Sequence, residues 1–150
     1  MKNKIITNKW SLVCQGSSVE AVTNLLSIYK VVDEVTVHPP KGPISELPKD
    51  GISVLFPHEF LSFWTRDTED LAEMKTKAEV NLIAPNKEIL FHKDVDLVFQ
   101  KDKPNLRFIV KSEALKIKIV GEYHYEMKVF IDNKTIVAEA SFVVKIGPAK

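Results

Sequence analysis

Apolar and polar residues alternate along the last third of the chain, from Ser112 to Ile146. A period of two places one kind of side chain on each face of an extended strand, whereas a helix needs apolar residues three and four apart. The pattern breaks at Gly121, as expected at a bend, and at Asp132-Asn133-Lys134, where Asp and Asn tolerate the positive φ angles of a tight turn. This region therefore predicts antiparallel strands, whose apolar sets are Leu115, Ile117 and Ile119; Tyr123, Tyr125, Met127, Val129 and Ile131; and Ala138, Ala140, Phe142, Val144 and Ile146.

Shorter segments of the same kind precede this region. Residues 77–85, 94–100 and 106–110 each predict a strand, and the turn-forming segments 85–87 and 102–105 separate them. Short strands with turns at regular spacing indicate a sandwich or a barrel. We therefore predict an all-β fold, an immunoglobulin-like antiparallel β-sandwich.

The N-terminal half is less regular. Residues 10–14 predict a strand, and residues 25–37 are rich in β-branched residues and predict one long or bulged strand. A helix over residues 18–32 competes with that interpretation, because Val19, Val22, Leu26 and Tyr29 would share a helical face. The prolines between Pro39 and Pro43 predict a loop that continues to Gly51, and the charged residues 65–77 predict a loop with room for one short helical turn.

Length, charge and cysteine content narrow the class of protein. A chain of 150 residues predicts a single domain, residues 1–150. The 21 Lys and Arg residues balance 20 Asp and Glu residues, so we expect no bulk attraction for nucleic acid or for a membrane. Lys2, Lys4 and Lys9 are not followed by a long apolar stretch, and no run approaches the ~20 apolar residues of a spanning helix. The single cysteine, Cys14, fits a reducing compartment, and we expect a cytoplasmic protein.

The closing strands resemble those of immunoglobulin and fibronectin type III sandwiches. In those folds a tyrosine near the start of the penultimate strand holds the preceding corner through its hydroxyl group. Tyr123 is the better candidate for this tyrosine corner, and Tyr125 is the second. The cysteine pair and the buried strand tryptophan of antibody domains have no counterpart here, so an antibody-type domain is not expected.

A wider resemblance covers most of the chain. An early strand ends in a cysteine (12–14), residues 24–29 lead to residues 31–35, a proline-bearing loop and an aliphatic strand follow, and Pro85-Asn86 and Gly121-Glu122-Tyr123 come later. This order is similar to that of a family of small uncharacterised prokaryotic proteins described as a domain of unknown function. The resemblance implies a β-sandwich, and it implies no catalytic or binding residue.

Residues able to do chemistry are sparse. None of the four histidines (His38, His58, His92 and His124) has a partner at the spacing of paired metal ligands, so we expect no metal or other cofactor. His124 and Glu126 share a strand face and could form a small polar site with Glu139 on the next strand, although an exposed face of a sheet gives the same pattern.

Nor does the sequence contain a motif of covalent or phosphate chemistry. Cys14 lacks a neighbouring base to activate it and is better explained as a buried structural residue. The chain has neither a glycine-rich phosphate loop nor a serine nucleophile elbow. The simplest interpretation of the pair Glu69-Asp70 is two solvated carboxylates in a charged loop. We therefore predict no catalytic residue.

The aromatic segment 54–66 is the most unusual part of the chain. If it is extended, Phe56, Phe60 and Trp64 share one face with His58, and the opposite face is apolar too. A central strand between two layers gives this pattern, and so does a strand whose outer face meets a partner. Pro57 favours an edge or a bulge, because it cannot donate a ladder hydrogen bond. Phe56, His58, Phe60 and Trp64 are accordingly a candidate interaction surface, with plain core as the alternative.

Three functions are compatible with these features. The first is a non-enzymatic β-sandwich module that works through protein–protein contact, including self-association as a homodimer. The second is a binding module for a small ligand or a carbohydrate, with Trp10 or Trp64 as its platform. The third is an enzyme whose site is assembled from distant residues. Nucleic-acid binding is not expected, because acidic residues interrupt the basic ones and lysines on a strand edge prevent unwanted pairing; the basic residues concerned are Lys101, Lys103, Arg107, Lys111, Lys116 and Lys118.

Overall fold

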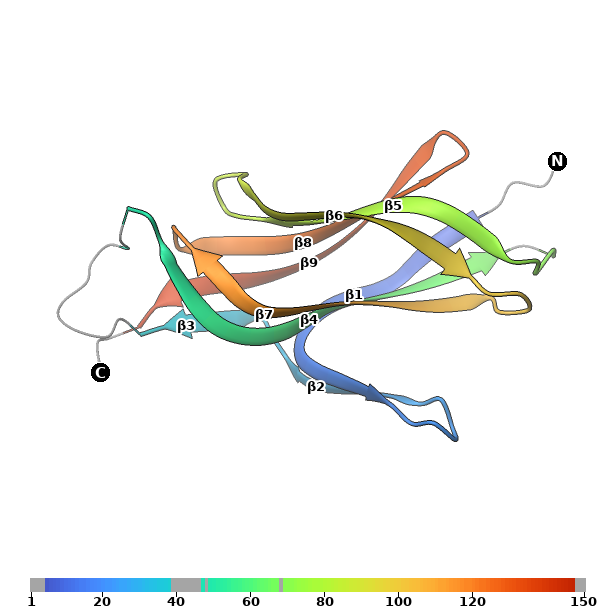
Figure 1. Ribbon diagram of the computed structural model, residues 1–150, viewed down its shortest axis with the longest axis horizontal. Coiled ribbons are helices and arrows are strands. Elements are labelled where there is room, and N and C mark those ends of the chain that lie inside the picture. Colours follow the sequence, from blue (N-terminus) through green and yellow to red (C-terminus); the bar gives the residue numbers. More distant parts are fainter. Residues whose placement is uncertain (1–4, 39–46, 48, 68, 148–150) are drawn as a thin grey trace.

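Two β-sheets packed face to face form the protein (Figure 1). The computed structural model describes residues 5–38, 47, 49–67 and 69–147. Over these residues the chain forms strands and no helix, which confirms the predicted all-β sandwich. The same residues offer no helix that is long and apolar enough to cross a membrane. The strands are β1 (Ile5–Val19), β2 (Leu26–Val31), β3 (Glu34–Val37), β4 (Ile52–Asp67), β5 (Met74–Ile83), β6 (Ile89–Phe99), β7 (Asn105–Ile117), β8 (Gly121–Ile131) and β9 (Lys134–Ile146).

The order of the strands differs from a purely antiparallel sandwich in one place. One sheet has the order β2-β1-β4-β7 and the other the order β3-β9-β8-β5-β6. Strand β3 runs parallel to β9, with Glu34 opposite Val143 and Val37 opposite Ile146. The predicted antiparallel arrangement is therefore wrong for this pair and right for the other neighbours.

The predicted single strand over residues 25–37 is in fact two strands in different sheets. Val32 still donates a hydrogen bond to the carbonyl of Val13, and Asp33 already accepts one from Val143, so the chain changes sheets between these two residues. Of the two alternatives for residues 18–32, the helix is wrong: residues 18–19 and 26–31 are in strands, and a turn joins them. Val19 pairs with Leu26 in a hairpin whose turn contains the positive-φ residue Asn24.

Beyond Cys14, where its pairing with β4 ends, β1 continues with β2 as a hairpin that bends away from the body of the sandwich (Figure 1). A hydrogen bond of 2.9 Å from Nη2 of Arg107 on β7 to the carbonyl of Asn24 ties the turn of the hairpin back to the sheet.

Strand β4 is central in its sheet and carries a bulge where the sequence has a proline. Its pairing with β1 ends at Glu59, and its register with β7 shifts between Leu55 and His58. Pro57 lies within this shift, beyond the end of the β1 ladder, so its missing N–H group breaks no regular ladder bond. The bulge predicted from Pro57 is confirmed.

The predicted loops have mixed outcomes. Strands β4 and β5 extend into the 65–77 segment, and its described residues contain no helical turn. Arg66, which is buried, holds this region by donating to the carbonyls of Ala72, Leu71, Gln100 and Lys103 at 2.6–3.2 Å. The loop from Pro39 to Pro43 lies outside the described residues.

Candidate functional site

The four residues of the candidate interaction surface lie inside the sandwich. The exposed fractions of Phe56, His58, Phe60 and Trp64 are 9%, 2%, 0% and 0%. Of the two alternatives for this segment, core is correct, because β4 is a central strand and this face points to the other sheet. Trp64 cannot be a ligand platform either, since its side chain is fully buried in a central strand.

Trp10, the other predicted platform residue, is more accessible. It is 36% exposed and stacks on Phe63, with 5.6 Å between ring centroids. Phe63 borders an open hollow of about 370 Å³ beside Arg107 and Asn24.

His58 and Tyr125 form a buried hydrogen-bonded pair between the sheets. Nδ1 of His58 lies 2.7 Å from the carbonyl oxygen of Phe56, and Nε2 lies 2.6 Å from the hydroxyl oxygen of Tyr125. The rings around them fix the geometry: Phe60 stacks on Tyr125 at 5.2 Å between centroids, and Phe56 stacks on His58 at 4.6 Å. Each ring of the pair is therefore positioned by a stacking partner in addition to their shared hydrogen bond.

Burial decides the charge state of this pair. Desolvation lowers the pKa of His58, and the hydrogen bond to the Phe56 carbonyl opposes the shift without reversing it. Desolvation also raises the pKa of Tyr125 to about 12. Both groups are therefore neutral near pH 7.

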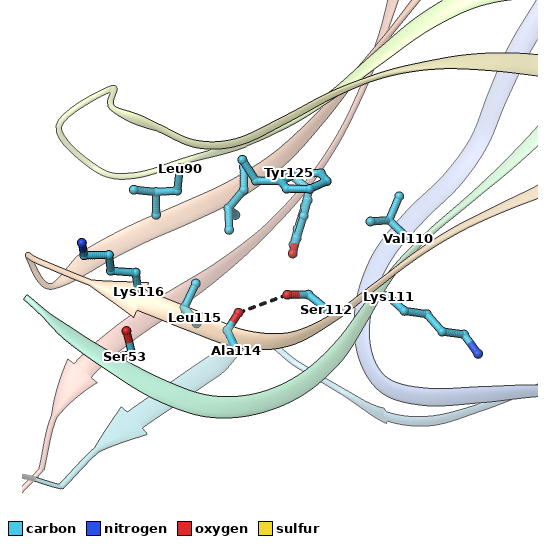
Figure 2. Close-up of a pocket in the computed structure, with 11 residues that line it drawn as sticks. Ser53, Leu90, Val110, Lys111, Ser112, Ala114, Leu115, Lys116 and Tyr125 are labelled. Atoms are coloured by element: carbon cyan, nitrogen blue, oxygen red, sulfur yellow. Dashed lines mark hydrogen bonds between the residues drawn. The ribbon is translucent and has the colours of Figure 1, made fainter.

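A cleft of about 290 Å³ opens beside Tyr125 on the side of the sandwich where the edge strands β6 and β7 face each other (Figure 2). Its walls are mainly apolar, and the Tyr125 hydroxyl points into the space between them in Figure 2. Lys116 stands at one end, whereas Lys111 points away from the cleft. The lining residues are Ser53, Leu82, Leu90, Phe91, Val110, Lys111, Ser112, Ala114, Leu115, Lys116 and Tyr125.

The bulge in β4 and the small residues of β7 explain why the sandwich is open here. Ser112 pairs with His58 and Ala114 pairs with Leu55, so one β4 residue more than β7 residues lies between these pairs. The inward alternation of β7 shifts at this point, and small side chains occupy positions from which larger ones would cover Tyr125. As predicted for this lysine-bearing stretch, β7 is an edge strand, with Lys111 and Lys116 exposed.

The tyrosine-corner contact is present at Tyr123. The side chain is fully buried, and its hydroxyl donates to the carbonyl of Ile119 at 2.6 Å. The ring stacks on Phe142 of the neighbouring strand. Tyr125, the second candidate, is committed instead to His58.

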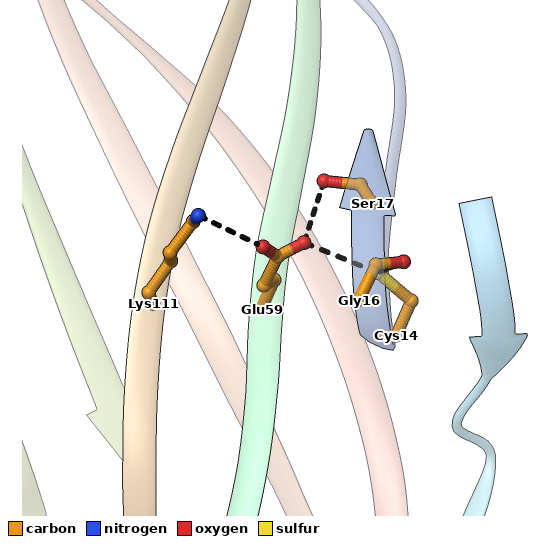
Figure 3. Close-up of polar contacts among 5 residues, drawn as sticks. All are labelled: Cys14, Gly16, Ser17, Glu59 and Lys111. Atoms are coloured by element: carbon orange, nitrogen blue, oxygen red, sulfur yellow. Dashed lines mark hydrogen bonds and ion pairs between the residues drawn. The ribbon is translucent and has the colours of Figure 1, made fainter. Parts of the chain in front are cut away.

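A buried carboxylate network lies at the base of the β1–β2 hairpin (Figure 3). Glu59 accepts a hydrogen bond from Ser17 at 2.6 Å and pairs with Lys111 at 3.6 Å. The thiol of Cys14 is fully buried, 3.8 Å from the same carboxylate. Burial first, and then the negative charge of Glu59, raise the pKa of Cys14. The thiol is therefore protonated, which fits the interpretation of Cys14 as a structural residue. The alternation of apolar and polar residues did not reveal that the carboxylate of Glu59 is buried.

The outer face of the five-stranded sheet is polar. The structure brings together His124, Glu126 and Glu139, whose nearest ligand atoms lie within 4.8 Å of one another. They border a hollow of about 580 Å³, and the ammonium group of Lys128 lies 3.4 Å from Glu126. The polar group suggested by the sequence is thus assembled, with a lysine beside it as counter-charge.

A second set of oxygen and nitrogen ligands lies on the same face. Glu79, His92 and Asp94 also have ligand atoms within 4.8 Å of one another. His92 is already engaged on both ring nitrogens, with Asn81 at 2.6 Å and with Asp94 at 3.2 Å. Spacing along the sequence could not reveal this set, because strand pairing and not local spacing brings Glu79 beside Asp94.

No protein-family model matches the chain, and no curated protein is similar to it in sequence. The resemblance to a prokaryotic domain of unknown function therefore stays a prediction.

Proposed function

We propose that this protein is a non-enzymatic β-sandwich binding module that holds a small, mainly apolar molecule in the cleft between β6 and β7. The observation that carries the proposal is the cleft itself, about 290 Å³ in volume, with apolar walls and the positioned Tyr125 hydroxyl. Ligand sites combine these features: concave apolar walls and a few polar groups that fix orientation. The volume is close to the lower end of such sites, which is roughly 300 Å³.

The state of the reactive groups favours binding over catalysis. The Cys14 thiol is protonated and fully buried. Both ring nitrogens of His58 are occupied by hydrogen bonds inside the protein. A phenol with a pKa of about 12 is a poor general base or nucleophile near neutral pH.

A titration with para-propylphenol tests this function. We expect saturable one-site binding by isothermal titration calorimetry, and we expect Ser112→Phe to weaken it by at least about tenfold because the new ring fills the cleft. Ser27→Phe, on the exposed face of β2, is the matched control and should bind like the wild type. If binding is absent, or survives Ser112→Phe unchanged, the cleft is not the site.

Self-association is a second candidate function, favoured by the β1–β2 hairpin. Exposed apolar side chains gather there, among them Val22 at 91% and Leu25 at 64% exposure. Such a group on a projecting hairpin is typical of a protein-binding surface.

The cytoplasmic location expected from the sequence also remains a prediction, and it can be tested by cell fractionation.

Light scattering over a range of concentrations tests self-association. The double variant Val22→Ser/Leu25→Ser should shift the protein toward monomer. Leu55→Ser, which removes a leucine of β4 that is 81% exposed, should not. A wild-type protein that stays monomeric throughout contradicts this candidate.

A further inference from the structure

The hydrogen atoms of the His58–Tyr125 pair can be assigned from the chemistry of their partners. A backbone carbonyl only accepts, so Nδ1 of His58 must carry the proton in its 2.7 Å contact with Phe56. In a neutral imidazole the other nitrogen is then an acceptor. The single hydroxyl proton of Tyr125 is consequently donated to Nε2 at 2.6 Å. What Tyr125 can still offer to the cleft is the lone pairs of its oxygen.

Ser112 is in the same position. Its hydroxyl donates to the carbonyl of Ala114 at 3.1 Å, which uses its only proton. The hydroxyl groups of Tyr125 and Ser112 therefore both present acceptors to the cleft. The third lining hydroxyl, Ser53, is exposed beside its ladder partner Lys116, where water satisfies it. Lys116 is a donor, but it is exposed at one end of the cleft, where water screens and satisfies it.

We infer that the cleft selects small neutral molecules that carry a hydrogen-bond donor, an alcohol, a phenol or an N–H group, on an apolar body. This inference rests on the proposed ligand-binding function. A molecule with only acceptors would set its lone pairs against those of Tyr125 and Ser112, and it would lose its hydration without replacement. A carboxylate would in addition lose the solvation of its charge.

The size of the cleft sets the size of the molecule. An apolar protein cavity of about 150 Å³ holds benzene. The cleft measures about 290 Å³, and so it has room for a body of roughly twice that size, such as a propyl-substituted ring.

A pair of probes that differ only in the donor tests the selectivity. Para-propylphenol and para-propylanisole have nearly the same apolar body, and the methyl group of the anisole removes the proton. We expect the wild-type protein to bind the phenol roughly three- to tenfold more tightly by isothermal titration calorimetry, the usual range for one net hydrogen bond.

Two variants then assign the preference to the pair. Tyr125→Phe removes the phenolic acceptor and leaves Ser112, so the preference for the phenol should fall, and an unchanged preference contradicts the assignment to Tyr125. His58→Phe releases the Tyr125 proton, so the hydroxyl can donate as well, and the anisole should gain relative to the phenol. Near-ultraviolet circular dichroism checks that each variant keeps its packing.

The outcomes separate the two proposals. Equal binding of both probes by the wild type overturns the donor selectivity and leaves the binding function standing. If neither probe binds, both the donor selectivity and the binding function are overturned. The wild-type comparison decides even if a variant does not fold.

Discussion

Replacing Tyr123 by phenylalanine removes one buried hydroxyl group and leaves the ring and its stack on Phe142 in place. The hydroxyl donates to the Ile119 carbonyl at 2.6 Å from a fully buried side chain. A net hydrogen bond contributes about 0.5–1.5 kcal/mol, and a carbonyl left without its donor adds to the loss. We expect the free energy of unfolding to fall by about 1–2 kcal/mol.

The same loss can be expressed as a melting temperature. Unfolding entropy is about 2.1 cal/mol/K per residue, which gives roughly 0.3 kcal/mol/K for a chain of 150 residues. The expected decrease in Tm is therefore about 3–6 °C. Urea denaturation should show a lower midpoint and an unchanged m value, since the same surface is exposed on unfolding.

Tyr29→Phe is the matched control. Tyr29 is more than half exposed, and its hydroxyl forms a hydrogen bond of 3.1 Å with the exposed side chain of Ser18. We expect a change below about 0.5 kcal/mol for this variant. Equal losses in the two variants, or no loss at Tyr123, would show that the corner hydrogen bond does not stabilise the fold.

Three further predictions follow from buried or constrained residues. His58→Gln should flatten the acid dependence of stability, because burial lowers the pKa of His58 in the folded protein. The contribution of His58 to the free energy of unfolding is complete above the unfolded pKa near 6.5, and it is lost as pH falls toward the lower folded pKa, by at most about 1.4 kcal/mol per pH unit. Parallel stability curves for the wild type and the variant would refute this. Cys14 in the native protein should react with a thiol reagent at least about a hundredfold more slowly than in urea, and comparable rates would contradict its burial. Gly51→Ala should cost roughly 1–3 kcal/mol, because φ is +76° and the new Cβ would lie 2.7 Å from the Ile117 carbonyl oxygen, whereas Gly16→Ala, which meets nothing within 4 Å, should be nearly neutral in the same urea titration.

Alternation and turn chemistry predicted the closing strands well because both signals are local. Asp132 and Asn133 do have positive φ angles, at 47° and 62°, and join β8 to β9 as expected. The corner contact of Tyr123 also joins residues four positions apart along the chain, so a short motif could suggest it.

Which sheet a strand joins could not be predicted in the same way. Residues 26–31 and 34–37 are both rich in β-branched or aromatic residues, yet they lie in different sheets. The backbone of Val32 bonds to Val13 in one sheet, and that of Asp33 bonds to Val143 in the other. Local composition contains no information about such partners.

The candidate cleft also depends on long-range structure. Alternation placed His58 and Tyr125 on faces that could both point inward, but their contact requires two particular strands to face each other across the core. The opening beside them depends on a one-residue bulge at Pro57 and on the small residue Ser112 in an edge strand. The sequence indicated the bulge. That the bulge opens access to the interior could not be predicted without knowing the order of the strands in the sheets.

The parallel pairing of β3 with β9 limits the order in which the strands can assemble during folding. Glu34 is translated long before its ladder partner Val143, because all the other strands except the end of β9 lie between them or before them in the chain. Until then β3 has no neighbouring strand, and the change of sheet at Asp33 lacks the hydrogen bond from Val143. The five-stranded sheet can therefore be completed only after β9 has been synthesised, so docking of β3 is expected to be a late step in folding.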